Sequence, residues 1–221
     1  MGGWTDGTWP HQSVHPPIRQ SAVSLTIARL HYDGGGDWYA NPSSLPNLLA
    51  AVRDRTGLAV APRERVVRLT DADLWDVPYL YMTGHGNVAF SGDEVALLRR
   101  YLEQGGFLHA DDNYGMDESF RREIARVLPG HPLVEVPADH PVYHLVFDFP
   151  DGLPKVHEHD GKPAQGFGIF LAGRLAVYYS YQSDLGDGWE DPEVHRDSAS
   201  VREAALRMGV NLVAYAVGGV R

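Results

Sequence analysis

The chain contains no cysteine among its 221 residues. Disulfides, thiolate metal ligands and a cysteine nucleophile are therefore excluded, and the redox compartment stays open. Basic residues are also scarce, because 19 Lys and Arg stand against 29 Asp and Glu and the formal net charge is −10. An acidic surface repels phosphate backbones, so the composition argues against nucleic acid as a partner.

Long apolar runs are missing as well. No stretch reaches the roughly 20 residues that a membrane-spanning helix needs. The opening ten residues, Met1 to Pro10, are rich in glycine and polar groups and lack the apolar core of a signal peptide. We therefore expect no membrane span, and a cytoplasmic protein as the sequence is written, or a periplasmic one if a leader has been removed.

The hydrophobic fraction of 43% is enough for one well-filled core. We expect an irregular N-terminal arm over residues 1–23 and a single α/β domain over 24–221. Short β-rich runs at 24–31, 65–70, 79–83 and 107–110 alternate with helical patterns. The first helix shows apolar residues at the i, i+3, i+4, i+7 spacing (Leu45, Leu48, Leu49, Val52), and Gly57 is suited to end it. This alternation predicts βαβ units and a mainly parallel sheet.

Further boundaries follow from local patterns. Ser91 and Glu94 form a capping-box pattern at the start of a helix, and Ser200 and Glu203 repeat it before the last helix. Alternation from Tyr143 to Phe149 predicts a half-exposed strand, and 168–180 reads as a hairpin that turns at 172–174. These segments predict a β-rich C-terminal elaboration near 140–182.

Three segments of the sequence resemble one bacterial family, catalogued as domain of unknown function 4159. They are Ala28–Tyr39 with its three consecutive glycines, Gly105–Asp112, and Asp139–Tyr143. The resemblance covers nearly the whole chain from about Ser24, and it implies the three-layer, flavodoxin-like sandwich of class I glutamine amidotransferase-like proteins. Those enzymes carry a cysteine at a sharp turn after a central strand, and the equivalent turn here lies near Asp111–Asn113. Because no cysteine is present, glutaminase chemistry is excluded.

Polar residues gather where the predicted strands end. In open α/β sheets, ligands bind outside the carboxyl ends of the strands. We therefore expect six side chains to converge on one pocket: His31, Asp33, His85, His109, Asp111 and Asp112. His109 and Asp111 should face one side of the sheet and Asp112 the other. His109, Asp111 and Asp112 are candidate catalytic residues, although either aspartate could instead cap the following turn through backbone amides.

The loop from Asp33 to Ser44 has the composition of a mobile lid. Three glycines give it freedom, Gly34–Gly36 can form an anion-binding nest, and Trp38 and Tyr39 supply an apolar underside. Candidate ligand-binding residues are accordingly His31, Asp33, Gly35, Trp38, His85 and Asn113. If the aromatic residues pack into the core, the loop is a structural plug instead.

The densest metal-like cluster is His157-Glu158-His159-Asp160. Two histidines at i and i+2 can bind one ion, with Asp111 or His85 as a third ligand. We take His157, His159 and Asp111 as the candidate metal set and Glu158 or Asp112 as the general base. A polar loop can also carry such residues by chance. The only cofactor that the sequence suggests is thus a divalent metal ion.

Two functions remain open. In the first, the chain is a divergent amidotransferase-like domain that binds a small polar ligand or a protein partner at the strand ends. In the second, it is a metal-dependent hydrolase acting on a polar or carbohydrate-like substrate. The loop Ser180–Asp191 mixes aromatic, amide and carboxylate groups, as sugar-binding loops do, or is a solvated acidic loop. No Gly-x-Ser-x-Gly elbow is present, which argues against a serine hydrolase.

Overall fold

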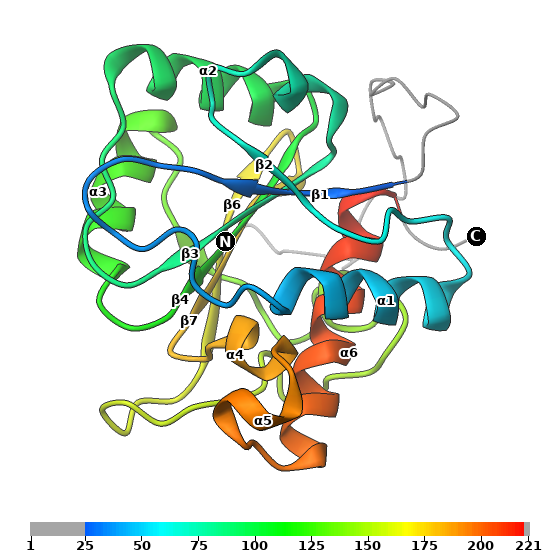
Figure 1. Cartoon of the computed structure of the whole chain (residues 1–221). Coiled ribbons are helices and arrows are strands. Elements are labelled where there is room, and N and C mark those ends of the chain that lie inside the picture. The colour runs from blue at the N-terminus through cyan, green and yellow to red at the C-terminus, as the bar shows by residue number, and fades with distance from the viewer. Residues whose placement is uncertain (1–24, 219–221) are drawn as a thin grey trace, which may run out of the picture.

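A computed structural model describes residues 25–218, and the arm expected over 1–23 lies outside this range. Within it, seven strands form one sheet in the order β2-β1-β3-β4-β7-β6-β5 (Figure 1). The strands are β1 (Ile27–Leu30), β2 (Arg65–Val67), β3 (Tyr79–Gly84), β4 (Phe107–Asp112), β5 (Val134–Glu135), β6 (Gln165–Leu171) and β7 (Arg174–Tyr181). β2, β1, β3, β4 and β7 run parallel, and β6 is antiparallel to both of its neighbours. The predicted mainly parallel α/β sheet is confirmed.

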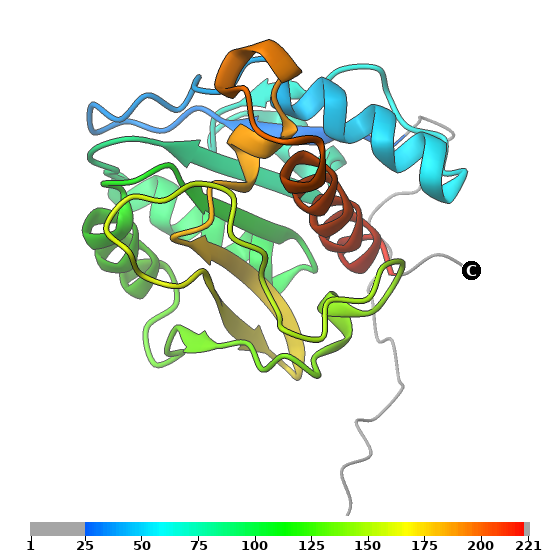
Figure 2. The same ribbon diagram turned by 90° about the horizontal axis from the view of Figure 1, so that it is seen from below.

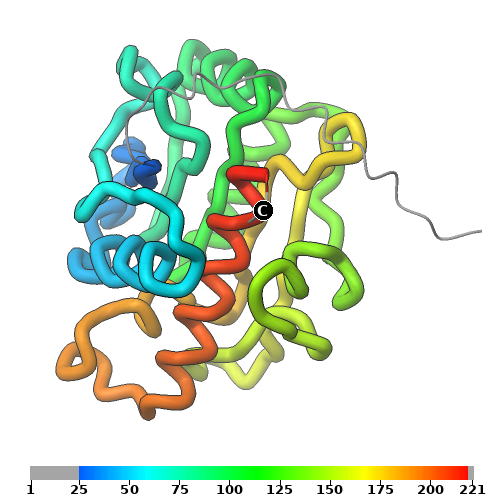
Figure 3. Tube along the Cα trace, turned by 90° about the vertical axis from the view of Figure 1, so that its right-hand side faces the viewer, coloured from blue at the N-terminus to red at the C-terminus, as the bar shows by residue number. Residues whose placement is uncertain are grey.

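Helices cover both faces of the sheet. In the described range they are α1 (Ser44–Thr56), α2 (Gly92–Glu103), α3 (Asp117–Val127), α4 (Leu185–Trp189), α5 (Pro192–His195) and α6 (Ala199–Ala216), with 3-10 turns at Ala72–Asp76 and Pro141–Tyr143. The buried residues of α2 and α3 share a core with one face of the strands, and those of α1, α4 and α6 share a core with the other. Figure 2 shows this division, and Figure 3 shows α1 beside α6.

The local patterns that predicted α1 and α2 are confirmed. Leu45, Leu48 and Val52 are fully buried on one face of α1, and Gly57 ends it in the left-handed conformation with φ of 72°. At α2 the Ser91 side chain accepts from the Glu94 amide, and the Glu94 side chain accepts from the Ser91 amide. This capping box fixes the start of the helix that joins β3 to β4.

The strand predicted from Tyr143 to Phe149 is wrong. Tyr143 ends a 3-10 turn, and the chain then runs irregularly beneath α6. Its backbone groups are satisfied by a side chain, since Asn211 Oδ1 accepts from the amides of Val146 (3.0 Å) and Phe147 (2.9 Å) and Asn211 Nδ2 donates to the Phe147 carbonyl (2.8 Å). The buried Asn211 of α6 thus supplies the backbone hydrogen bonds that a neighbouring strand would otherwise supply to this segment.

The second capping box is also misplaced. α6 begins after Ser198, whose side chain accepts from the Val201 amide at 3.3 Å, and not after Ser200. Glu203 is drawn away from the helix start, because its carboxylate pairs with Arg55 and Arg207, both at 2.7 Å. The Ser-x-x-Glu pattern is present in the sequence, but two arginines bind its glutamate, which therefore does not cap the helix.

The hairpin predicted over 168–180 is confirmed. β6 and β7 are antiparallel and turn at Ala172 and Gly173, with φ values of 50° and 80°. β7 also pairs in parallel with β4, with Asp111 opposite Ser180, so the β-rich segment extends the main sheet. No helix of residues 25–218 is long and apolar enough to cross a membrane.

Candidate functional site

The end of β4 divides its polar residues between the two faces of the sheet, as predicted. His109 and Asp111 lie on the side of α1, α4 and α6, where the His109 ring is 5.9 Å from the Trp189 ring. Asp112 lies on the opposite side, where its carboxylate accepts from the Tyr179 hydroxyl at 3.2 Å. A single pocket therefore cannot take the side chains of all three.

Asp111 is fully buried and its carboxylate is fully engaged. It accepts from the amides of Gly186 (2.6 Å) and Leu185 (3.2 Å), from the Tyr81 hydroxyl (3.2 Å) and from the Ser180 hydroxyl. Burial raises the pKa of Asp111 to about 6, and the hydrogen bonds from Ser180 and Gly186 oppose that rise. Asp111 thus caps the first turn of α4, far away in the sequence, and not the turn that follows β4.

His109 is part of the same buried chain of polar groups. Its Nδ1 lies 2.8 Å from the Tyr79 hydroxyl and its Nε2 lies 2.9 Å from the Ser180 hydroxyl. Burial lowers the pKa of His109 to about 3, so the ring is neutral at pH 7. His109 has no exposed surface and contacts no solvent-reachable group. Its role is to support the buried side chains around it.

Asp112 caps the turn after β4. Its carboxylate accepts from the Met116 amide at 3.0 Å, and burial raises its pKa. Asn113, next in the chain, is also buried, and its Oδ1 accepts from the Thr83 hydroxyl at 3.1 Å. The capping of the following turn, which the sequence left open for either aspartate, is therefore performed by Asp112, whereas Asp111 caps α4.

The residues after β1 and β3 form two separate surface groups. His31 Nε2 lies 2.8 Å from an Arg68 nitrogen, and Arg68 also pairs with Asp33 at 3.4 Å. His85 is exposed, and its Nδ1 lies 3.0 Å from Asp37. Neither group is in contact with His109 or Asp111. The structure thus divides the six residues expected in one pocket among several places along the sheet edge.

The predicted lid is tied down at its start. The Gly36 amide donates to the Asn87 carbonyl (2.9 Å), and the Ala89 amide donates to the Asp33 carbonyl (2.8 Å). Gly34 and Gly36 lie so close to residues 85–89 that a Cβ at either would clash, whereas Gly35 is open. Trp38 is half-buried and stacks on His31 at 4.0 Å, while Tyr39 is 64% exposed. The packed Trp38 is the arrangement expected of a structural plug, whereas the exposed Tyr39 is the arrangement expected of a lid. The loop therefore combines features of both predictions.

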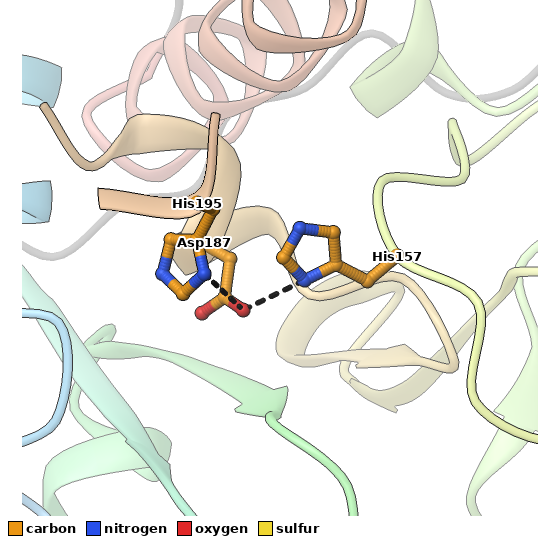
Figure 4. A group of neighbouring side chains, drawn as sticks. All are labelled: His157, Asp187 and His195. Carbon is orange, nitrogen blue, oxygen red and sulfur yellow. Dashed lines mark ion pairs between the residues drawn. The ribbon is translucent and has the colours of Figure 1, made fainter. Parts of the chain in front are cut away.

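Within residues 25–218, one group of metal-type side chains lies close together: His157, Asp187 and His195 each offer one atom within 4.8 Å of the others (Figure 4). His157 comes from the loop before β6, Asp187 from α4 and His195 from the end of α5. Asp187 Oδ2 lies 2.9 Å from His157 Nδ1 and 3.7 Å from His195 Nδ1. Of the expected metal set, only His157 belongs to this group.

His159 and Asp184 lie next to it. His159 Nε2 contacts Asp184 Oδ2, which is 3.8 Å from His157 Nδ1. The His159 ring stacks on Tyr114 at 4.6 Å. Burial, with the charges of Asp111 and Asp187 as lesser causes, raises the pKa of Asp184 to about 9. Burial, with the charges of His157 and Lys155 as lesser causes, lowers the pKa of His159. His159 is thus a neighbour of His157 through Asp184, and Asp111 is held apart from both by its own partners.

Glu158 does not join the cluster. Its side chain is 73% exposed and pairs with Lys155 at 3.7 Å. Two other residues that the sequence did not single out do join it: His195, and Asn41, whose Nδ2 donates to Asp187 Oδ1 at 2.6 Å. Asp187 lies in the Ser180–Asp191 loop, whose carboxylates were the only sequence signal for it. No short motif links 41, 157, 187 and 195.

The fold and these side chains define an α/β protein with a histidine–aspartate cluster at the carboxyl edge of a mainly parallel sheet. The family described as Domain of unknown function (DUF4159) matches residues 26–217, and the chain belongs to this family. A search of curated proteins finds no match.

Proposed function

We propose that this chain is a divergent amidotransferase-like domain that lacks glutaminase activity and binds a small polar ligand where β4 and β7 end. The order β2-β1-β3-β4-β7 supports a flavodoxin-like core, because that fold has the order 2-1-3-4-5 and β7 takes the fifth place. The left-handed Tyr114, with φ of 75°, supports a sharp turn after β4 where amidotransferases carry their nucleophile.

The observation that carries the proposal is a group of buried polar atoms without partners. Among the described residues six such side-chain atoms occur, and three belong to the turns after β4 and β7: Asn113 Nδ2, Gln182 Oε1 and Asp184 Oδ1. Each costs about 1–3 kcal/mol if it stays unpaired. Gln182 and Asp184 also hold left-handed backbone, with φ of 58° and 61°. Strain and unpaired groups together are typical of binding sites.

The chemistry of these atoms indicates the ligand. One amide donor and two oxygens match a compound with both hydroxyl and carbonyl or amide groups, such as a polyol, a sugar or a carboxamide. Because the atoms are buried, a small molecule fits them better than the surface of a protein partner.

A screen of polyols, monosaccharides and small amides by saturation-transfer NMR tests the proposal. We expect binders of the parent that also bind Gln104→Met, a control at an exposed glutamine, and that fail to bind Gln182→Met, which removes one unpaired oxygen. If none of these compounds binds the parent, or if Gln182→Met binds them equally, the proposal is wrong.

A metal-dependent hydrolase is the second candidate, and the cluster of His157, Asp187 and His195 favours it. In this version Asp187 and His195 take the places of His159 and Asp111, and Asp184 replaces Glu158 as the acid–base group because its Oδ2 lies 3.8 Å from His157 Nδ1. Zn²⁺-dependent hydrolysis of chromogenic glycosides or esters, lost in Asp184→Asn, is the expected result. Hydrolysis that is absent with and without Zn²⁺ would leave the binding domain as the better account.

A further inference from the structure

We propose that His157, Asp187 and His195 bind one divalent transition-metal ion of the Zn²⁺ type. This inference is distinct from the polar ligand proposed above, because its three metal ligands are other side chains and only Asp184 enters both arguments. Two imidazole nitrogens and a carboxylate oxygen are a ligand set that Zn²⁺ uses in proteins. Figure 4 shows the Asp187 carboxylate between the two rings, which approach it from different elements.

The distances suit a metal ion. Ligands about 2.0–2.1 Å from a tetrahedral Zn²⁺ lie roughly 3.3 Å from one another. Asp187 Oδ2 is 2.9 Å from His157 Nδ1 and 3.7 Å from His195 Nδ1, one distance on each side of this value. Small rotations of side chains that are partly solvent-exposed would bring the three atoms to coordination distance.

The outer polar atoms of two of the ligands already have partners. His157 Nε2 lies 3.0 Å from Asp197 Oδ1, and Asp187 Oδ1 accepts from Asn41 Nδ2 at 2.6 Å. A metal-bound histidine almost always donates its other N–H to a carboxylate, carbonyl or water, and a metal-bound carboxylate is itself hydrogen-bonded. These contacts leave His157 Nδ1 and Asp187 Oδ2 directed at each other.

A structural ion-pair network is the alternative account. If His157 donates through Nε2 to Asp197, its Nδ1 and Asp187 Oδ2 are two lone-pair atoms in contact, and a cation must lie between them. A proton would satisfy that one contact. A metal ion would satisfy it together with the contact between Asp187 Oδ2 and His195 Nδ1, and therefore explains more of the arrangement.

The surrounding charge also favours a cation. Asp184 has only 1% of its side chain exposed, its Oδ2 is 3.8 Å from His157 Nδ1, and its Oδ1 has no partner. Within residues 25–218 the ion pairs of Asp184, Asp187 and Asp197 are all with histidines, and none is with lysine or arginine. Carboxylates in a partly buried site without such a partner are costly unless another cation balances them. Three protein ligands with an exposed His195 would leave a position open to water or substrate.

Titration of the chelator-treated full chain with Zn²⁺ by calorimetry, and with Co²⁺ by visible spectroscopy, tests the inference. We expect one equivalent of Zn²⁺ and the absorption bands of tetrahedral Co²⁺. His195→Gln is the decisive variant, since its exposed side chain can be lost without harm to the core. We expect it and His157→Gln to bind Zn²⁺ at least about 100-fold more weakly, and Asn41→Ala about 10- to 100-fold more weakly.

Two controls separate this site from accidental binding. His144→Gln removes an exposed histidine that contacts only Asp148 and a carbonyl, and it should bind Zn²⁺ as the parent does. Replacement of His11 and His15 by glutamine, both outside the described residues, should also leave binding unchanged. The inference is overturned if the parent binds no Zn²⁺, or if thermally stable His157→Gln and His195→Gln bind it with the parent's affinity.

Discussion

At the scale of single residues, His109 shows how burial sets chemistry. The ring lies among Tyr79, Tyr81, Tyr178 and Trp189, with centroid distances of 5.4–6.1 Å. Neither nitrogen reaches solvent, and both face hydroxyl groups. A neutral ring is compatible with these partners, whereas an imidazolium in this surrounding would be desolvated and without a paired charge.

This predicts a pH dependence of stability. The pKa of His109 is lowered from 6.5 to about 3 in the folded chain. Between these values the unfolded state binds a proton that the folded state refuses, so stability is full above about pH 6.5 and falls as the pH drops. The loss is about 1.4 kcal/mol per pH unit for one proton. Chemical denaturation of the parent and of His109→Gln between pH 4 and 7 measures it.

The comparison with His109→Gln is needed because Asp111 acts in the opposite direction. Its pKa is raised from 3.8 to about 6, so its contribution falls as the pH rises through that range. Asp111 is present in both proteins, and the difference between their pH slopes therefore isolates His109. Identical slopes would show that the ring takes up a proton without unfolding.

At the scale of elements, a capping pattern determines where a helix begins only when its side chains have no stronger partner elsewhere. Ser91 keeps Glu94 as its capping partner, and α2 begins as predicted. Glu203 instead binds Arg55 and Arg207, and the helix start moves to Ser198. Competition from a distant arginine is invisible in a local pattern, which is why this boundary was missed.

The start of α6 can be tested with two alanine variants. Ser198→Ala should lower the free energy of unfolding by about 1 kcal/mol, because the Val201 amide loses its acceptor. Ser200→Ala should cost less, since its hydroxyl contacts only that of Ser198. Urea denaturation at pH 7 compares them, and a larger loss for Ser200→Ala would restore the sequence-based boundary.

The same reasoning explains what the sequence revealed of the site. Periodicity and turn signals predicted the strand over 107–110 and the hairpin that brings Ser180 opposite Asp111. His157 was recognised because a histidine pair is conspicuous. Asp187 and His195 lie on α4 and α5, which are 5 and 4 residues long and too short for a periodic pattern. Their meeting with His157 depends on tertiary packing alone.

At the scale of the whole molecule, the first and last thirds of the chain are joined through Glu190. Its buried carboxylate accepts from the Ser43 amide (2.9 Å), the Ser43 hydroxyl (2.9 Å) and the Ser44 amide (3.2 Å) at the start of α1. Asn47 of α1 donates to the Trp189 carbonyl at 2.9 Å. The same junction holds Asn41 against Asp187. The geometry of the cluster thus depends on a contact between segments nearly 150 residues apart.

Removal of this carboxylate should have a double effect. We expect Glu190→Ala to lower the free energy of unfolding by about 2–3 kcal/mol, because three donors at the start of α1 lose a charged acceptor. It should also weaken Zn²⁺ binding, since Asn41 is no longer fixed beside Asp187. Glu193→Ala, at an exposed position of α5, is the matched control and should change neither. Unchanged stability of Glu190→Ala would contradict this account.

The position of β7 has a consequence for synthesis of the protein on the ribosome. β4 lies in the middle of the finished sheet, yet its second neighbour, β7, begins 62 residues after β4 ends, at Arg174. Until that hairpin emerges, one side of β4 is an unpaired strand edge, open to pairing with another nascent chain. Ser180, Leu185 and Gly186, which satisfy His109 and Asp111, arrive later still. A ribosome that pauses before residue 174 would therefore expose an aggregation-prone edge lined with unpaired polar groups, and chaperone demand should peak there.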